Sequence, residues 1–258
     1  MTVPPRRDDA EYVIETRGVS KQFGKFIAVN NVDLKVRRGT IHSLIGPNGA
    51  GKTTLFNLLT RFLPPSAGRI LYKGEDITST RPSDLPKRGI GRSFQISAVF
   101  PHLTVMENVR IALQRAEGIS FHFWRPARSL RAVAAEAMAL LATLGLEVYG
   151  AQRAAELPYG RKRVLELATT LALKPEILLL DEPTAGLGHE DVARITALIA
   201  EVAKGRSVLM VEHNLGVVAD LSHTITVLQR GEILTEGPYE TVSRDPEVIE
   251  AYMGMGHA

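Results

Sequence analysis

The sequence predicts an α/β fold built on a mixed sheet, with a helical segment inserted into it. Up to about residue 95, short apolar runs are bounded by turn residues, as expected for strands. Residues 104–156 instead carry an alanine-rich helical pattern. After Gly160, helices alternate with uncharged runs of four or five residues, a pattern typical of buried parallel strands.

The predicted elements follow one another in the order that an α/β chain requires. Turn glycines precede the early strands, and the helix in the inserted segment is expected to end at Gly145. The strands are expected over 40–45, 69–72, 177–180 and 207–211, and the helices over 131–144, 164–173 and 192–203.

Composition narrows the classes of protein. The 258 residues are 45% hydrophobic and 23% charged, which is typical of globular chains and excludes disorder, collagen and coiled coil. The absence of cysteine excludes a disulfide framework, a cysteine-based zinc site, an iron–sulfur centre and a thiol nucleophile. With 31 Lys and Arg against 28 Asp and Glu, the net charge of +3 is too small to indicate nucleic acid as a partner.

Residues 1–11 are expected to form a loose tail. They are mostly polar and lack the apolar run of a secretory signal. No stretch approaches the ~18 consecutive apolar residues of a membrane span, because the most apolar helical segment, 132–146, is interrupted by Glu136. A role at a membrane would therefore require membrane-embedded partners. The remaining residues, 12–258, are expected to form a single domain.

Eight residues between a predicted strand and a predicted helix match the pattern G-x-x-x-x-G-K-[ST]. Glycines at this spacing allow backbone N–H groups to surround phosphate oxygens, and the helix that follows adds its partial positive charge. Lys52 is expected to reach the β- and γ-phosphates, and the Thr53 hydroxyl to bind Mg²⁺. The residues expected to bind the nucleotide here are Gly46, Pro47, Asn48, Gly49, Ala50, Gly51, Lys52, Thr53 and Thr54.

A second motif is an apolar run over 177–180 that ends in two carboxylates. Because ligands bind at the carboxyl edge of a parallel sheet, Asp181 is expected to hold Mg²⁺ through water. Glu182 is expected to orient and deprotonate the attacking water. A capping acid before Pro183 is the alternative for these carboxylates. Beside a phosphate loop, the pair predicts hydrolysis of ATP.

These motifs resemble those of the ATP-binding cassette (ABC) ATPase family, and the resemblance extends from about Tyr12 to Met253. It implies an α/β P-loop NTPase whose mixed sheet core and antiparallel β subdomain occupy about 12–95 and 164–258. A helical subdomain insert occupies about 96–163. ATP and Mg²⁺ are the implied cofactors.

Further family motifs occur in the family's order. Phe23 matches the aromatic ring that stacks on adenine, although taken alone it is more typical of a core residue. Gln95 matches the glutamine loop that contacts Mg²⁺ and the attacking water. His213 matches the switch histidine, which bonds the γ-phosphate, although alone it is more typical of a structural histidine. The resemblance thus gives Lys52, Gln95, Glu182 and His213 as catalytic residues and Thr53, Gln95 and Asp181 as Mg²⁺ ligands.

The segment 157–161 stands where the family has its Leu-Ser-Gly-Gly-Gln signature, which caps the triphosphate held by a partner cassette. Pro158 replaces the serine and removes a hydroxyl and an N–H from the γ-phosphate cradle, and Gly188 replaces a usual aspartate. Three cations at 161–163 oppose the macrodipole of the next helix, which fits either a bound anion or a solvated basic face. By this resemblance the residues that contact nucleotide are Leu157, Tyr159, Gly160 and Arg161.

The family also implies partners. Two cassettes enclose two ATP molecules, and each site uses the phosphate loop of one chain and the signature of the other. The chain has one of each, so it is expected to dimerise, and the altered signature favours a heterodimer with a related cassette over a homodimer. Two transmembrane permease subunits and, indirectly, a solute-binding protein complete the implied assembly at the cytoplasmic face of the bacterial inner membrane, where this chain is peripheral.

Three segments are similar to the ATPases of branched-chain (hydrophobic) amino acid importers: 157–160, 100–108 and 245–254. The expected function is therefore ATP-driven uptake of branched-chain or other hydrophobic amino acids. Three alternatives stay open, because an ATPase never touches the transported solute. They are an importer of urea, amides or aromatic compounds, an exporter of lipid or lipopolysaccharide, and a soluble ABC protein without a transport role.

An aromatic cluster over 121–124 lies in the helical insert, with Arg125 and Arg128 beside it. It fits either a surface that docks on transmembrane partners or a local core under a loop. Assembly of a Trp124→Ala variant with the membrane subunits would distinguish the two.

Overall fold

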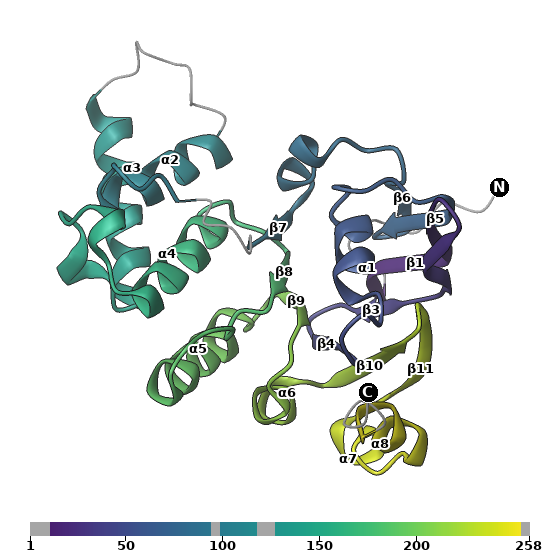
Figure 1. Ribbon diagram of the computed structural model, residues 1–258. Helices are drawn as coiled ribbons and strands as arrows, with labels where there is room; N and C mark the ends of the chain where they lie inside the picture. The colour runs from purple at the N-terminus through teal and green to yellow at the C-terminus, as the bar shows by residue number, and fades with distance from the viewer. Residues whose placement is uncertain (1–10, 94–98, 118–126, 254–258) are drawn as a thin grey trace.

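The computed structural model describes residues 11–93, 99–117 and 127–253. Within them the chain forms two sheets, a group of helices beside the larger sheet and a pair of helices near the C-terminus (Figure 1). Three features singled out in the sequence lie outside the described residues: most of the expected tail (1–10), Gln95 and the aromatic cluster 121–124.

A six-stranded sheet in the order β11-β10-β4-β9-β8-β7 forms the centre of the fold. Five of its strands run parallel, and β11 pairs antiparallel with β10 at the edge. Every residue of β4, β8 and β9 is buried, as expected for parallel strands whose sequences are mostly apolar. The strands are β4 (Ile41–Ile45), β7 (Ile90–Arg92), β8 (Ile177–Asp181), β9 (Ser207–Val211), β10 (Thr224–Gln229) and β11 (Glu232–Gly237).

An antiparallel sheet lies beside the first and confirms the expected antiparallel β region. Its order is β2-β1-β5-β6, and β3 also pairs with β1. The strands are β1 (Tyr12–Phe23), β2 (Phe26–Val32), β3 (Lys35–Arg37), β5 (Ala67–Tyr72) and β6 (Glu75–Asp76).

Helix α1 (Lys52–Leu59) lies between the two sheets, and its apolar side chains join a core to which both sheets contribute. Side chains along β8 alternate between this core, which receives Ile177 and Leu179, and the core of the helical region, which receives Leu178 and Leu180. This is the period of a strand that is covered on both faces. The segment between β4 and α1 is thereby held at the carboxyl edge of the parallel strands.

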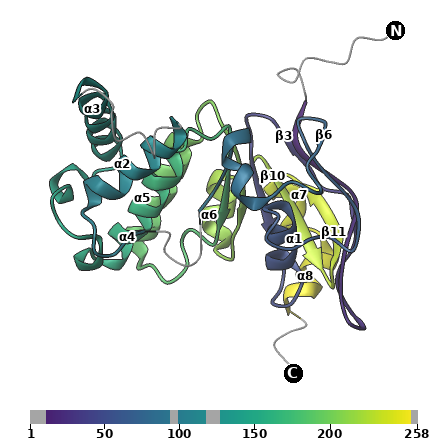
Figure 2. The ribbon, with the colours of Figure 1, turned by 90° about the horizontal axis from the view of Figure 1, so that it is seen from above.

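Four helices pack together beside the six-stranded sheet (Figures 1 and 2). Helix α2 (Val105–Ala116) begins with a capping box formed by Thr104 and Glu107. Helices α3 (Ala127–Thr143), α4 (Tyr159–Leu171) and α5 (His189–Val202) share one buried core with it. The short 3₁₀ helices are η2 (Pro82–Asp84), η3 (Pro86–Arg88), η4 (Glu147–Tyr149) and η5 (Ala154–Glu156).

Three short helices occur toward the end of the described residues: α6 (Leu215–Leu221), α7 (Tyr239–Val242) and α8 (Pro246–Met253). Val218 of α6, Val242 of α7 and Val248 of α8 form a separate core with β10 and with Ile45, the last residue of β4. The C-terminal helices therefore pack against the strand that leads into the phosphate loop.

The expected strand bounds agree with the structure to within two residues, whereas the expected helices begin too late: α3 begins at 127 rather than 131, and α5 at 189 rather than 192. The strand 207–211 has its predicted bounds, and the strand 177–180 extends by one residue to Asp181. Helix α4, however, begins at Tyr159 rather than at 164, so the cations 161–163 lie inside it. Pro158 has φ −56° and occupies the N-cap position, where the missing N–H of proline breaks no helical hydrogen bond.

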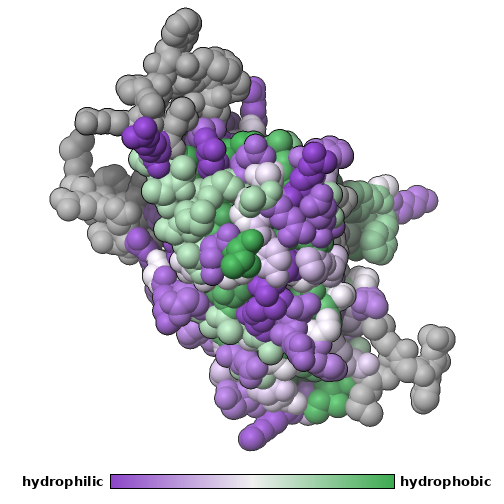
Figure 3. Space-filling view, turned by 90° about the vertical axis from the view of Figure 1, so that its left-hand side faces the viewer, coloured by the Kyte–Doolittle hydropathy of each residue, from purple (hydrophilic) through white to green (hydrophobic). Residues whose placement is uncertain are grey.

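The surface formed on the side of α2, α3 and α4 carries both hydrophilic and hydrophobic residues. Figure 3 shows hydrophilic residues on this side that surround smaller hydrophobic areas. No helix in the described ranges is both long enough and apolar enough to cross a membrane.

Candidate nucleotide-binding site

The phosphate loop joins β4 to α1 and has glycine where two other strands approach closely. A Cβ on Gly46 would lie 2.1 Å from the Leu228 carbonyl oxygen, and a Cβ on Gly51 would lie 2.4 Å from the Ala28 carbonyl oxygen. Gly51 also has φ 101°, a conformation that favours glycine. The close approach of β10 and β2 thus requires glycine at both positions.

Lys52, the first residue of α1, is only 5% exposed. Its Nζ donates hydrogen bonds to the carbonyl oxygens of Gly46 (2.6 Å) and Pro47 (2.9 Å). Burial lowers the pKa of Lys52, and the nearby Glu182 carboxylate opposes this shift. The ammonium group therefore lies over the loop, where a phosphate oxygen would be a stronger acceptor than the two carbonyls.

Glu182 and His213 meet where β8 and β9 end. His213 Nε2 lies 2.6 Å from Glu182 Oε1. Glu182 has φ 49°, a left-handed conformation that costs energy in a residue with a side chain. Both side chains line a cavity of about 280 Å³ together with residues 48–54 of the loop and of the start of α1. The structure therefore brings three of the four predicted catalytic residues to one cavity.

Asp181, the last residue of β8, is 3% exposed, and neither of its carboxylate oxygens has a hydrogen-bond partner among the described residues. Arg92 Nη2 lies 3.5 Å from Asp181 Oδ2. Burial raises the pKa of Asp181, and Arg92 opposes this shift. A buried carboxylate with only this one long ion pair among the described residues fits a further cation. Mg²⁺ commonly takes one or two carboxylates together with phosphate oxygens and water, which fits a carboxylate and a hydroxyl as donors. Thr53 is exposed in the phosphate-loop cavity, whereas Asp181 lines a separate small cavity with Ser93 and Pro183.

Two phenylalanines flank the turn between β1 and β2. Phe23 is 46% exposed, and Lys21 Nζ lies 5.1 Å from the centre of its ring. This exposure rules out the core position that Phe23 alone would suggest. Phe26 is 65% exposed and lines the same cavity as Lys52. The sequence reasoning did not select Phe26, although the two residues Gly24 and Lys25 between the phenylalanines were a usable turn signal. The hairpin register pairs Phe26 with Phe23.

The signature-like segment at the start of α4 does not line this cavity. Leu157 is buried in the helical core. Tyr159 is half exposed, and its hydroxyl donates to the Ala185 carbonyl oxygen (3.3 Å). The Arg161 guanidinium donates to the Gly145 carbonyl oxygen (3.2 Å). Within the described part of one chain, the predicted signature contacts are thus separate from the phosphate loop.

Acidic side chains offset the cations in the first turns of α4. Arg163 Nη1 lies 2.9 Å from Glu166 Oε2. A Cβ on Gly160 would lie 2.5 Å from Asp191 Oδ2, so the Asp191 carboxylate of α5 rests directly against the first turn of α4. A carboxylate at this position interacts favourably with a helix N-terminus. Two carboxylates of the chain itself, Glu166 and Asp191, therefore lie near these cations or the helix start that they oppose.

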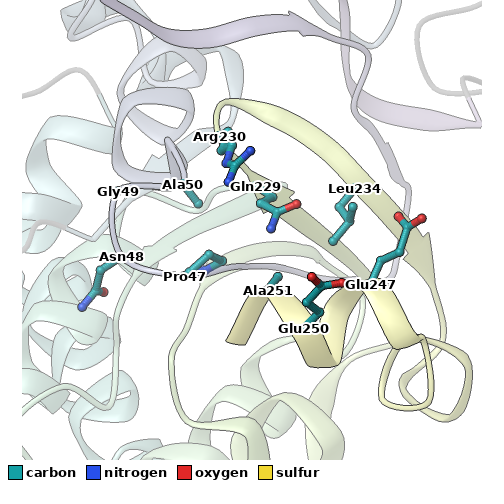
Figure 4. Close-up of a pocket in the computed structure, with 10 residues that line it drawn as sticks. All are labelled: Pro47, Asn48, Gly49, Ala50, Gln229, Arg230, Leu234, Glu247, Glu250 and Ala251. Carbon is teal, nitrogen blue, oxygen red and sulfur yellow. The ribbon is translucent and has the colours of Figure 1, made fainter. Parts of the chain in front are cut away.

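A second cavity, of about 590 Å³, lies between the phosphate loop and helix α8 (Figure 4). In addition, the Tyr252 hydroxyl of α8 accepts a hydrogen bond from the Gly46 backbone, which opposes the rise in the pKa of Tyr252 caused by burial. Helix α8 is therefore in contact with the first residue of the phosphate loop. The residues that line the cavity are Pro47, Asn48, Gly49, Ala50, Gln229, Arg230, Leu234, Glu247, Glu250 and Ala251.

Arg92 is another residue of the site that the sequence reasoning did not select. Besides its ion pair with Asp181, its guanidinium donates to Thr60 Oγ1 (2.6 Å) and to Asn57 Oδ1 (2.9 Å) of the α1 region. The usable signal was a cation three residues before Gln95, directly after the short uncharged segment 89–91. Arg92 thereby connects the phosphate-loop helix to the carboxylate of β8.

The fold and the loop geometry together define a P-loop nucleotide-binding protein. A family model described as "ABC transporter" matches residues 29–185, and a second, described as "Branched-chain amino acid ATP-binding cassette transporter", matches residues 232–258. The chain belongs to the ABC transporter family.

Curated relatives align with nearly the whole chain. It is 37% identical over 249 residues to the high-affinity branched-chain amino acid transport ATP-binding protein BraF of Pseudomonas aeruginosa, with 94% of this chain and 98% of the relative covered. It is 36% identical over 249 residues to the protein LivG of Escherichia coli strain K12, which has the same description and the same coverage.

Solved structures confirm the cassette fold. A nucleotide-free ATP-binding cassette from an ABC transporter has a TM-score of 0.82 at 30% identity and covers 93% of this chain and 98% of its own. A cassette in its ADP conformation has the same score and identity, with 94% and 99% covered. A dimeric cassette bound to ADP and Pi has a TM-score of 0.74 at 25% identity, with 88% and 98% covered.

The predicted fold class and the family resemblance are thus confirmed. The chain binds nucleotide, and its enzymatic class is that of an ATPase whose activity is coupled to transport. Cassettes of this family dimerise and act with transmembrane subunits.

Proposed function

We propose that the chain is the ATP-hydrolysing subunit of an importer of branched-chain or other hydrophobic amino acids. The observation that carries this proposal is similarity over the whole chain: relatives named for branched-chain amino acid transport cover 94% of it. The separate match of residues 232–258 to a branched-chain amino acid cassette model adds support from a segment outside the general cassette match.

We infer that residues 12–258 act as one ABC ATPase domain with a helical subdomain over about 96–163. The shared core of α2, α3, α4 and α5 with β8 and β9 supports this division, because the helical region packs directly on the central sheet. Closure of the cassette would then move elements that carry both the site and the helical region.

The chemistry follows from the positions of the side chains. The backbone of the phosphate loop and Lys52 would hold the phosphates, and Thr53, Asp181 and Gln95 would hold Mg²⁺. Mg²⁺ supplies charge neutralisation between the β- and γ-phosphates when bound. Glu182 would accept a proton from the attacking water, a role worth about 10²–10⁴-fold in rate. His213, 2.6 Å from Glu182, would orient that carboxylate and bond the γ-phosphate.

The contacts to nucleotide from Phe23, Leu157, Tyr159, Gly160 and Arg161 belong to the same proposal. Phe23 presents an exposed ring for adenine. The start of α4 would meet the γ-phosphate bound by a second cassette, since it lines no part of its own chain's phosphate-loop cavity.

We infer that this second cassette is a related but different chain. Pro158 at the N-cap of α4 has no side-chain capping bond, so the half-site that this chain offers lacks a hydroxyl and an N–H. A partner with an intact signature would leave one strong site in the dimer. Equal turnover by the purified chain alone and with its partner cassette would contradict this heterodimer.

The complete assembly would include two permease subunits and, indirectly, a solute-binding protein. It would place this chain peripherally at the cytoplasmic face of the bacterial inner membrane. Co-purification of the chain with its membrane subunits, identified by mass spectrometry, tests both parts of this assembly.

Uptake of labelled leucine tests the function directly. Cells that lack this chain would be complemented with the wild type or with Glu182→Gln. We expect only the wild type to restore uptake, because the variant retains the fold but loses the base. Leucine uptake that does not depend on the chain would contradict the substrate assignment and direct the search to urea, amides or aromatic acids.

A further inference from the structure

Glu212 follows β9 directly, and its side chain is 2% exposed. Its carboxylate accepts four hydrogen bonds and forms no ion pair in the described part of the chain. Oε1 accepts from the backbone N–H (3.0 Å) and the hydroxyl (2.5 Å) of Thr184. Oε2 accepts from the backbone N–H groups of His213 (2.8 Å) and Asn214 (3.1 Å). A buried carboxylate that is satisfied only by neutral donors is an unusual arrangement.

The two oxygens hold two different loops. Thr184 lies two residues after Glu182 in the loop that follows β8, whereas His213 and Asn214 begin the loop that follows β9. The Glu182 carboxylate and the His213 ring, 2.6 Å apart, each belong to one of these loops. The Glu212 side chain therefore connects the two segments whose side chains meet in the cavity.

The backbone at Glu182 requires such support. Its φ of 49° is a strained conformation that persists only where the surrounding structure enforces it. The Glu182 N–H donates to the Val211 carbonyl oxygen (2.9 Å), and the Ala185 N–H donates to that of Glu182 (3.1 Å). The two bonds from Thr184 to Glu212 fix the chain between these points.

We propose that Glu212 is a positioning residue for ATP hydrolysis. By accepting hydrogen bonds from the loops after β8 and β9, its carboxylate fixes the side chains of Glu182 and His213 relative to each other. The inference rests on the proposed roles of those two residues. An ionised carboxylate has only acceptors and suits four donors. A glutamine would turn an NH₂ group toward one of the two loops and release it.

The first test compares steady-state ATPase rates of the wild type, Glu212→Gln and Glu201→Gln. Glu201 is the matched control, because its partner Lys204 and its own side chain are exposed. We expect Glu212→Gln to lower kcat by about tenfold to a hundredfold, as expected for a small misplacement of reacting groups, with KM for ATP changed by less than about threefold. Glu201→Gln should match the wild type.

Thr184→Val provides a milder variant if Glu212→Gln fails to fold. It removes only the hydroxyl and keeps the backbone N–H donor, so a smaller fall in kcat is expected. Thermal unfolding with and without ADP monitors the fold of each variant. A rise in KM with kcat unchanged, in either folded variant, would overturn the proposal.

A double-mutant cycle separates positioning from a purely structural role. In a Glu182→Gln background there is no base left to position, so adding Glu212→Gln should lower the residual rate little further. A further loss as large as in the wild-type background would overturn the proposal. Failure of the proposed function would be seen in other measurements. If Glu182 is not the base, the Glu182→Gln variant alone would retain turnover. If leucine is not the substrate, leucine uptake would not depend on the chain, and the result of this cycle would not change.

Discussion

Asp181 is buried with its carboxylate oxygens free of hydrogen bonds from the described residues, and this arrangement opposes folding in the absence of a ligand. Burial raises its pKa, which means that the folded chain disfavours the ionised form. The penalty is absent below the ordinary carboxyl pKa of about 3.9. It grows as the pH rises through the raised pKa of the folded state.

Asp181→Asn should therefore stabilise the nucleotide-free chain at pH 7. The neutral amide avoids the cost of a buried charge, and this gain outweighs the lost ion pair with Arg92 because burial is the dominant cause of the pKa shift. We expect a melting temperature raised by a few degrees at pH 7, at about 2–4 °C per kcal/mol for a chain of this size. The gain should shrink toward pH 4, and the stabilisation by ADP with Mg²⁺ should weaken.

Asp76→Asn is the matched control, and it should change the melting temperature in the opposite direction. Hydrogen bonds from the Thr78 hydroxyl and backbone lower the pKa of Asp76, so its ionised form stabilises the fold above the ordinary carboxyl pKa. That contribution is lost as the pH falls through the lowered value. Asp76→Asn should lower the melting temperature at pH 7. A destabilising Asp181→Asn at the same pH would contradict the account of Asp181.

Two glycines of the phosphate loop provide a second comparison between single residues. Gly51→Ala should strongly destabilise the chain and abolish nucleotide binding, because its Cβ would lie 2.4 Å from the Ala28 carbonyl oxygen. Gly49 also has a positive φ, 79°, but its Cβ would meet nothing within 4 Å. Gly49→Ala should cost only the left-handed strain of about 1–2 kcal/mol.

Chemical denaturation and titration with a fluorescent ATP analogue would measure both glycine variants. If the two variants lose equal stability, then backbone conformation rather than the contact with β2 is what requires glycine at position 51.

The sequence identifies those residues of the site whose roles depend on local context. The phosphate loop, Asp181, Glu182 and His213 each follow an apolar strand, and the carboxyl edge of a parallel sheet brings such positions together. The sequence does not reveal Arg92 and Glu212, because the roles of these residues depend on partners that are far away in sequence. A lone Glu beside a histidine does not reveal four buried hydrogen bonds.

At the scale of elements, helix α8 is joined to the phosphate loop. Val248 packs with Ile45, and the Tyr252 hydroxyl accepts from the Gly46 backbone. Residues 232–258 match a family model separate from the general cassette model, and they include the whole of this helix. The segment that marks the branch of the family thus supports the first residue of the nucleotide-binding loop.

Tyr252→Phe should weaken ATP binding. The substitution keeps the ring but leaves the Gly46 N–H without its acceptor, and one hydrogen bond contributes about 0.5–1.5 kcal/mol. We expect the Kd for ATP, measured by calorimetry, to rise by about two- to tenfold.

Ile249→Ala serves as the control on the same helix, because the Ile249 side chain is 44% exposed. It should leave the Kd for ATP unchanged. A Tyr252→Phe variant that binds ATP as tightly as the wild type would show that α8 does not support the loop through its hydroxyl.

The start of helix α4 shows where sequence rules for elements fail. A proline followed by three cations indicates a loop by local rules, because cations oppose the macrodipole at a helix N-terminus. In the fold, Glu166 pairs with Arg163 and the Asp191 carboxylate rests against Gly160. Helix α5 supplies that second carboxylate, so no local pattern could place the start of α4 at Tyr159.

At the scale of the whole molecule, the two segments proposed to form one ATP site lie apart within a chain. The phosphate-loop cavity contains Glu182 and His213 but no residue of the segment 157–161. The family's cassettes dimerise, and a second chain would bring its own α4 to this cavity. The specific activity of the isolated chain should therefore rise with protein concentration and fall on dilution.

Complementation between two inactive variants tests this arrangement. Lys52→Ala removes the cation proposed to bind the phosphates. Gly160→Asp adds a carboxylate at the start of α4 and displaces this segment, because a Cβ at position 160 would lie 2.5 Å from Asp191 Oδ2. Each variant alone has two defective sites per homodimer. In an equal mixture, half of the dimers contain one of each chain, and each of these has one site with both halves intact.

We expect the mixture to recover about a quarter of the turnover of the isolated wild type, because half of the dimers carry one working site out of two. Thermal unfolding would confirm that both variants fold, and Gly160→Asp should still bind ATP through its intact phosphate loop. If the mixture stays inactive while the wild type hydrolyses ATP, the two ATP sites of a dimer do not function independently of each other. Activity of either variant alone would show that its substituted residue is not needed, and a specific activity constant on dilution would show that one chain is sufficient.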